Sequence, residues 1–280
     1  MRSVTVMLHR AYKILSVSAL AFAALSGPSF AEADTACDLS NGYAVTPAAF
    51  QQEANACTKG VSGVETDTVM ADQLLRLASE QRTSQGEAEL STLTSLSEAA
   101  RLHALDMAVR GYASHTDLEG RSHLDRVRMI ERSALLGAFG ANIVIVKAGA
   151  TAEDVQKVIM ADELNAANIT RDEFDHMGIA AVEANGVLYV VQLFARVDGQ
   201  LKTPVPMAAA PRTNLAASYS DKFEPVGWSV VSASGETLMR GIGSKLPASV
   251  PEITEGFIQM DVESNNSIYT LRGPAISSSL

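Results

Sequence analysis

The sequence reads MGIAAVE at residues 177–183 and VLYVVQLF at residues 187–194, with Asn185-Gly186 between the two runs, and this stretch decides the fold. Asn-Gly between two apolar runs is the strongest short-range signal of a β-hairpin, because both residues tolerate the positive φ of a type I′ turn. The second run is almost continuously apolar, which favours a strand buried on both faces. We therefore expect an antiparallel pair near the centre of a sheet.

Four segments with helical periodicity precede this hairpin. The second begins at a capping box, Ser95-x-x-Glu98, and ends at Gly111, which suits the left-handed conformation of a helix terminus. The fourth begins at another box, formed by Thr151 and Asp154. Helices followed by adjacent antiparallel strands predict an α+β layered domain.

The chain changes character after this domain. Residues 198–222 contain Pro204, Pro206 and Pro211 amid alanine and threonine, which is typical of a linker. Beyond it, short apolar runs alternate with turn signals and predict a small all-β module over residues 223–280. The expected strands are 227–233, 236–242, 257–263 and 267–272.

The N-terminus has the order of a cleavable signal peptide. Basic residues at Arg2, Arg10 and Lys13 precede an apolar run at 14–25, and Ser29-Phe30-Ala31 has the small-x-Ala pattern that signal peptidase reads. A membrane anchor is the alternative, but spanning a bilayer needs about 20 apolar residues. We expect the signal peptide to occupy residues 1–31 and the protein to be exported, to the periplasm or to the extracellular space.

Charge and cysteine content limit the partners. The formal net charge is −10 and no run of lysine or arginine forms a basic patch, so no nucleic-acid partner is expected. No later stretch is long and apolar enough to span a bilayer, so no stable membrane insertion is expected. The two cysteines, Cys37 and Cys57, predict a disulfide in an oxidising compartment. This bridge would tie down an irregular N-terminal arm at residues 32–66.

Six elements occur in a fixed order and spacing between residues 96 and 196. They are AARLHALDMA (99–108), GYASHTDLEG (111–120), GANI (140–143), AANI (166–169), FDHMGIA (174–180) and QLF (192–194). Through this ordered set, the region resembles the CAP superfamily, in the bacterial branch of SCP-like extracellular domains. The resemblance implies a three-layer α-β-α sandwich over residues 67–197, with an open cavity that in many members is lined by two histidines and acidic or hydroxyl residues.

Carried over position by position, the resemblance places His115, Ala141, Asp162 and Asn165 at the cavity positions, with Asn142 beside them. Ala141 stands where the family has a glutamate and Asn165 where it has its second histidine. A catalytic zinc site needs three protein ligands, and only His115 and Asp162 would supply them here. The expected site is therefore degenerate, with no metal and no cofactor.

Other polar residues near this region have simpler interpretations. Asn142 and Asn168 suit the satisfaction of backbone groups, because an amide both donates and accepts hydrogen bonds. His103 is expected to be a packed helix residue, His123 to lie at a helix N-terminus, and His176 to lie in a loop. There is no G-x-S-x-G elbow, no P-loop and no dinucleotide fingerprint.

Two functions of different classes follow. The first is a non-catalytic binding or interaction protein whose partner is a small apolar ligand or a component of the cell envelope, and the loss of two cavity ligands favours it. The second is a hydrolase of the peptidase or esterase type, with His115 as general base oriented by Asp162. No catalytic residue is assigned beyond these two candidates.

Overall fold

The computed structural model describes residues 37–277, which belong to one compact unit. The predicted signal peptide lies outside the described residues. Within residues 37–277, no helix combines the length and the apolar character needed to cross a membrane.

Helices and strands alternate irregularly along the chain. The helices are α1 (Pro47–Ala56), the short 3-10 turn η1 (Cys57–Lys59), α2 (Thr68–Ser84), α3 (Thr94–Arg110), α4 (His123–Ile130), α5 (Ala152–Ala161) and α6 (Glu163–Thr170). The strands are β1 (Val64–Thr66), β2 (Ser91–Thr92), β3 (Ala134–Lys147), β4 (His176–Ala184), β5 (Val187–Leu201), β6 (Ala217–Tyr219), β7 (Glu224–Val231), β8 (Thr237–Gly241), β9 (Gly256–Ser264) and β10 (Ser267–Ile276).

The predicted hairpin is confirmed as β4 and β5. Ala184 pairs with Val187, and the turn residues Asn185 and Gly186 have φ of 52° and 76°. β5 is central, because β4 pairs with one of its edges and β3 with the other. The main strand order of the sheet is β1-β4-β5-β3-β10-β9-β7-β8, and β2 and β6 lie off this path, paired with β4 and β5 respectively.

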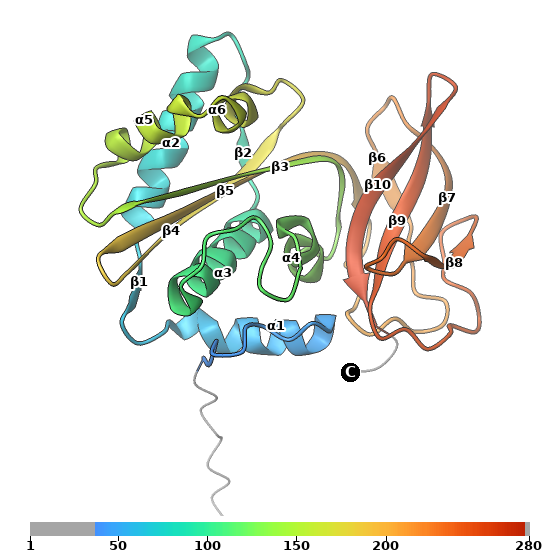
Figure 1. Ribbon diagram of the computed structural model, residues 1–280. Helices are drawn as coiled ribbons and strands as arrows, with labels where there is room; N and C mark the ends of the chain where they lie inside the picture. Colours follow the sequence, from blue (N-terminus) through green and yellow to red (C-terminus); the bar gives the residue numbers. More distant parts are fainter. Residues whose placement is uncertain (1–36, 278–280) are drawn as a thin grey trace, which may run out of the picture. The chain divides into compact units, whose positions relative to one another are not determined.

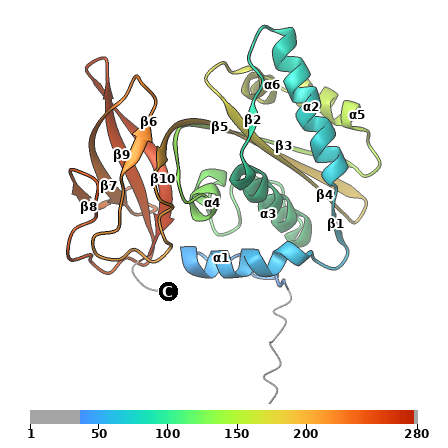
Figure 2. The same ribbon diagram turned by 180° about the vertical axis from the view of Figure 1, so that it is seen from behind.

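The first half of this sheet lies between two layers of helices. Figure 1 shows α2, α5 and α6 over one face of β3, β4 and β5, and α3 and α4 over the other, and Figure 2 shows the same layers from behind. Each face has its own apolar core, and alternate residues of the strands belong to alternate cores. The domain is thus the α+β three-layer sandwich that the sequence predicts.

Helix boundaries agree with the sequence signals at two of three places. Gly111 ends α3 with φ of 68°, and the Thr151 side chain accepts from the backbone N–H of Asp154 at the start of α5. The capping box predicted at Ser95 is wrong. The helix already includes Thr94, and the Ser95 hydroxyl donates instead to the Glu131 carboxylate at 2.6 Å.

The N-terminal arm also differs from the expectation of an irregular segment. It contains α1, which starts with Pro47 in its first turn and buries Pro47, Phe50 and Ala54. Alanine provides most of its apolar residues on all sides, so the sequence shows no clear helical period, and packing supplies the stability that such a short helix lacks in isolation.

The C-terminal strands have a core of their own and are also joined to the sandwich. β10 pairs with β3 through Arg272 and Leu136. Arg128 of α4 is buried and donates to the carbonyl oxygens of Gly273 and Ile258, at 2.7 Å each. The segment expected as a linker contributes buried side chains to the C-terminal core. These are Leu201, Val205, Ala209 and Leu215.

Candidate functional site

The loop between α3 and α4, residues 111–122, contains His115, the first candidate residue. Asp117 is buried, and its carboxylate accepts from the backbone N–H groups of Glu119 and Arg121 at 3.1 and 2.8 Å. Ser122 then starts α4 through a capping box with Asp125. These short-range bonds position His115 on the loop between the two helices.

Three histidine rings from α3, the loop and α4 lie in a row. The His103 and His123 centroids are 4.4 Å apart at an interplanar angle of 73°. The His115 and His123 centroids are 5.3 Å apart, and His115 Nδ1 lies 3.2 Å from His123 Nε2. His103 and His123 are buried, whereas His115 is exposed.

Hydrogen bonds fix the proton on His103. Arg126 Nη1 donates to His103 Nδ1 at 2.7 Å, and a guanidinium can only donate. His103 Nδ1 is therefore unprotonated, and its Nε2–H donates to the carbonyl of Ser114 at 2.7 Å. Burial, reinforced by the charge of Arg126, lowers the pKa of His103 to about 4. Burial also lowers the pKa of His123, to about 2, so both rings are neutral at pH 7.

A network of six charged side chains surrounds these rings, and its members are Asp106, Asp117, Glu119, Arg110, Arg121 and Arg126. The Arg126 guanidinium is 1% exposed, and its Nη2 lies 3.0 Å from Asp117 and 3.6 Å from Asp106. Arg110 donates two hydrogen bonds to the Asp106 carboxylate, at 2.7 and 2.9 Å. It donates two more to the Glu119 carboxylate, at 2.7 and 2.8 Å.

The positive and negative charges of this network balance one another. Asp106, Asp117 and Glu119 bring oxygen atoms within 4.8 Å of one another, which is a spacing that a metal ion could use. Each of these carboxylates is already held by a guanidinium, however, and Tyr112 also donates to Asp106 at 2.6 Å. The bonds from Arg110 lower the pKa of Glu119. No uncompensated negative charge remains in this group of three acids to attract a cation.

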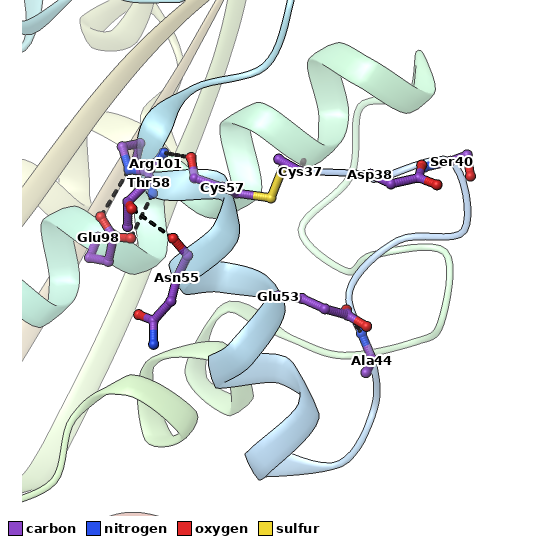
Figure 3. The surroundings of a disulfide bond; sticks show 10 residues. All are labelled: Cys37, Asp38, Ser40, Ala44, Glu53, Asn55, Cys57, Thr58, Glu98 and Arg101. Atoms are coloured by element: carbon purple, nitrogen blue, oxygen red, sulfur yellow. Dashed lines mark hydrogen bonds and ion pairs between the residues drawn. A yellow bond between two sulfur atoms is a disulfide. The ribbon is translucent and has the colours of Figure 1, made fainter. Parts of the chain in front are cut away.

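The predicted disulfide is confirmed and closes a segment over this network. Figure 3 shows the bridge between Cys37 and Cys57, whose Cα atoms are 4.6 Å apart. We call residues 37–57 the disulfide loop. Arg121 donates to the carbonyl oxygens of Tyr43, at 2.7 Å, and of Ala44. The Tyr43 ring lies 6.0 Å from the guanidinium carbon of Arg126. The disulfide loop thereby helps to exclude water from the buried charges.

A second polar cluster lies between β3 and α6, and it consists of amides. Asn142 donates to the Asn165 carbonyl at 3.1 Å and to the Gln192 side chain at 3.0 Å. Asn168 donates to the Asn142 side chain at 2.9 Å and to the Ala141 carbonyl at 3.2 Å. These bonds join α6 to the sheet, so the amides hold structure together.

The structure brings some of the predicted site residues together and separates others. Asn142 and Asn165 meet at the face covered by α6, whereas the Ala141 side chain packs into the core on the α3 side. Asp162 is exposed between α5 and α6, where its carboxylate accepts from the backbone N–H groups of Leu164 and Asn165 at 3.0 and 2.9 Å. Throughout residues 37–277, no hydrogen bond, ion pair or ring contact joins Asp162 to His115.

Sequence reasoning missed the charge network. Its members offered one signal, because two acid–arginine pairs have the i,i+4 spacing that brings side chains together on a helix or tight turn. These pairs are Asp106 with Arg110, and Asp117 with Arg121. The contact of Arg126 with His103 joins two different helices and has no local signature.

Comparisons with known proteins support a CAP domain within the chain. Residues 75–194 match CAP, the cysteine-rich secretory protein family. No curated protein matches the chain in sequence. Among solved structures, an outer surface protein from Borrelia burgdorferi is 14% identical, with a TM-score of 0.41 and coverage of 48% of this chain and 98% of that one.

Two further solved structures are bacterial. An extracellular protein containing an SCP domain, from Bacillus anthracis, is 18% identical, with a TM-score of 0.40 and coverage of 46% of this chain and 41% of that one. A cysteine-rich secretory protein from Staphylococcus aureus is 14% identical, with a TM-score of 0.30 and coverage of 46% of this chain and 38% of that one. The match of residues 75–194, together with the three-layer fold, identifies this part of the chain as a CAP domain.

Proposed function

We propose that this protein is an exported CAP-domain protein that acts by binding, without catalysis. One observation carries the proposal: the two residues that a hydrolase would combine are engaged elsewhere. His115 bonds to His123, and Asp162 caps α6. A general base needs its orienting group within hydrogen-bond reach, and this pair lacks that contact.

The export proposal rests on the signal-peptide pattern and on the family. The family model that matches residues 75–194 describes secretory proteins. A disulfide fits an oxidising compartment, either the periplasm or the extracellular space. Intact-mass measurement of the exported protein should find a chain that begins at Glu32, and a chain that retains residues 1–31 would contradict export by cleavage.

The ligand we propose is a small apolar molecule or an apolar part of an envelope component. An open hollow of about 540 Å³ lies between the disulfide loop and the end of α3. Its apolar lining includes Leu39, Val61, Val109 and Leu118, of which the Leu118 side chain is 62% exposed. Its polar lining consists of Asp38, Ser40 and Arg110. Ligand sites typically have volumes of about 300–1,000 Å³ and mostly apolar walls.

The test is to extract purified protein with organic solvent and to identify bound small molecules by mass spectrometry. We expect a stoichiometric apolar compound in the wild type and its loss in Leu118→Asp. The matched control is Ile242→Asp, because Ile242 is 86% exposed but lies beyond β8. Equal loss in both variants, or no compound in the wild type, would contradict binding in this hollow.

The metal site that the sequence marks as degenerate gives a separate prediction. The double variant Ala141→Glu and Asn165→His would restore the two missing ligand types of the family. Because the Ala141 side chain packs on the α3 side and Asn165 belongs to α6, we expect the restored groups not to converge and zinc not to bind stoichiometrically. Tight zinc in the wild type or in this variant would show that the positions share one cavity.

A further inference from the structure

We propose that His103 and His123 form an acid-sensitive latch, so that their protonation releases the disulfide loop while the rest of the domain stays folded. The inference concerns regulation and stands whether or not the protein binds an apolar ligand. It rests on the direction of the hydrogen bonds among the three rings and on the balance of charge around them.

The bond from Arg126 to His103 exists only while His103 is neutral. Nδ1 of His103 accepts from a guanidinium at 2.7 Å, and an imidazolium has no lone pair with which to accept. A proton on Nδ1 therefore breaks this bond and places two cations against each other in a site where Arg126 is fully enclosed.

The second buried ring, His123, is also unfavourable to protonate. One proton between His115 Nδ1 and His123 Nε2 satisfies their 3.2 Å contact. A further proton on His123 would have no acceptor, because the remaining nitrogen of His123, Nδ1, is buried and has no hydrogen-bond partner. A charge on His123 would also lie beside His103, whose ring is 4.4 Å away between centroids.

Within residues 37–277, no unpaired acid acts on these two rings to compensate the added protons. The groups whose charges act on the two rings are Arg126, His115, Asp106 and Asp117. Both acids are already held by arginines, and with Glu119 the network contains three acids and three arginines. Each protonated histidine therefore adds an unbalanced positive charge to a buried site, which is costly.

The disulfide loop is attached to the charge network through Arg121. The same oxygen of Asp117, Oδ2, accepts from Arg121 at 2.7 Å and from Arg126 at 3.0 Å, and Arg121 holds the Tyr43 and Ala44 carbonyls of the loop. A displacement of Arg126 from a charged His103 therefore disturbs the anchor of the loop directly. The Cys37–Cys57 bridge keeps the two ends of the released segment joined, so release is expected to be reversible.

The direction of the pH dependence follows from the pKa values. Both folded pKa values lie below the usual histidine value of 6.5, so the released state binds more protons. The latch is fully closed above about pH 6.5, and the equilibrium for release rises about tenfold per pH unit for each histidine that takes up a proton as pH falls.

The test is hydrogen exchange with mass spectrometry between about pH 7 and pH 4.5, a window below the ordinary histidine pKa, with correction for the intrinsic exchange rate. We expect exchange in peptides from residues 37–57 to rise by about tenfold per pH unit for each histidine that takes up a proton, while peptides from β9 and β10 keep their protection. His103→Gln should fold at pH 7, since its amide can accept from Arg126 and donate to Ser114, and the pH slope should fall by one proton.

His123→Gln should also reduce the pH slope of exchange in residues 37–57 by one proton. This variant provides the test if His103→Gln fails to fold. The control is His176→Gln, because His176 lies on β4 with Asp175 as its partner at 2.6 Å. Equal slopes in the wild type and in the His103 or His123 variant would overturn the proposal. So would simultaneous loss of protection in residues 37–57 and in β9 and β10, because that is ordinary acid unfolding.

Discussion

Arg126→Met tests how much the buried charge network stabilises the fold. Arg126 is 1% exposed and contacts His103, Asp117 and Asp106 at 2.7, 3.0 and 3.6 Å. Methionine keeps most of the volume but leaves His103 Nδ1 without a donor and gives the network a net negative charge. Removal of one partner from a buried ion pair costs about 3–5 kcal/mol.

The expected loss lies at the lower end of this range, at about 3 kcal/mol. Asp106 keeps both bonds from Arg110, and Asp117 keeps Arg121 and two backbone N–H groups, so neither carboxylate is left bare. Domains of this kind are stable by only about 5–15 kcal/mol, so the variant should unfold at markedly lower denaturant concentration.

The assay is urea unfolding at pH 7, with the slope m checked for constancy so that the midpoint reports stability. The matched control is Arg76→Met, because Arg76 pairs with Glu80 on α2 while both side chains are more than half exposed. That variant should lose no more than about 0.5 kcal/mol. A loss below about 1 kcal/mol for Arg126→Met, or equal losses in the two variants, would refute the assignment of the network as a stabilising core.

Three further predictions concern the fold. Reduction of the Cys37–Cys57 bridge, or Cys37→Ser with Cys57→Ser, should lower the free energy of unfolding by about 3 kcal/mol, measured by urea titration, and no change would show that the bridge is dispensable. Gly178→Ala should destabilise by about 3 kcal/mol, because its Cβ would overlap the backbone nitrogen of Ser97, and an unchanged melting temperature would contradict this close approach. Limited trypsin digestion should cut first after Arg212, because Arg212 and the preceding Ala210 and Pro211 are exposed and Arg212 lies in a turn, and first cuts within 96–196 would contradict the domain division proposed from the sequence.

Local signals predicted much of the fold correctly. The turn at Asn185-Gly186, the terminator Gly111 and the cap at Thr151 depend on the conformational preferences of one or two residues, and such preferences can be recognised in a sequence. Ser95 failed because its hydroxyl has a distant competitor, Glu131, which no local pattern reveals.

The candidate site was less accessible to prediction. Asp162 follows Val155 by two helical turns, so a continuous helix would place both on one face, but the chain leaves the helical conformation at Asp162, with ψ of 123°. An aspartate there stabilises the start of α6 by accepting two backbone N–H groups, which competes with helix continuation. The arrangement of His103 with Arg126, and of the loop carbonyls with Arg121, depends on packing between elements far apart in the sequence.

We propose that His115 belongs to a structural cluster with His123 and does not act as a catalytic base. The most direct measurement is turnover of a panel of peptide and ester substrates at pH 7 by the wild type beside His115→Ala, prepared identically. The account predicts that the two proteins show the same background rate on every substrate. Turnover by the wild type that His115→Ala abolishes, in a variant that melts at the wild-type temperature, would contradict it.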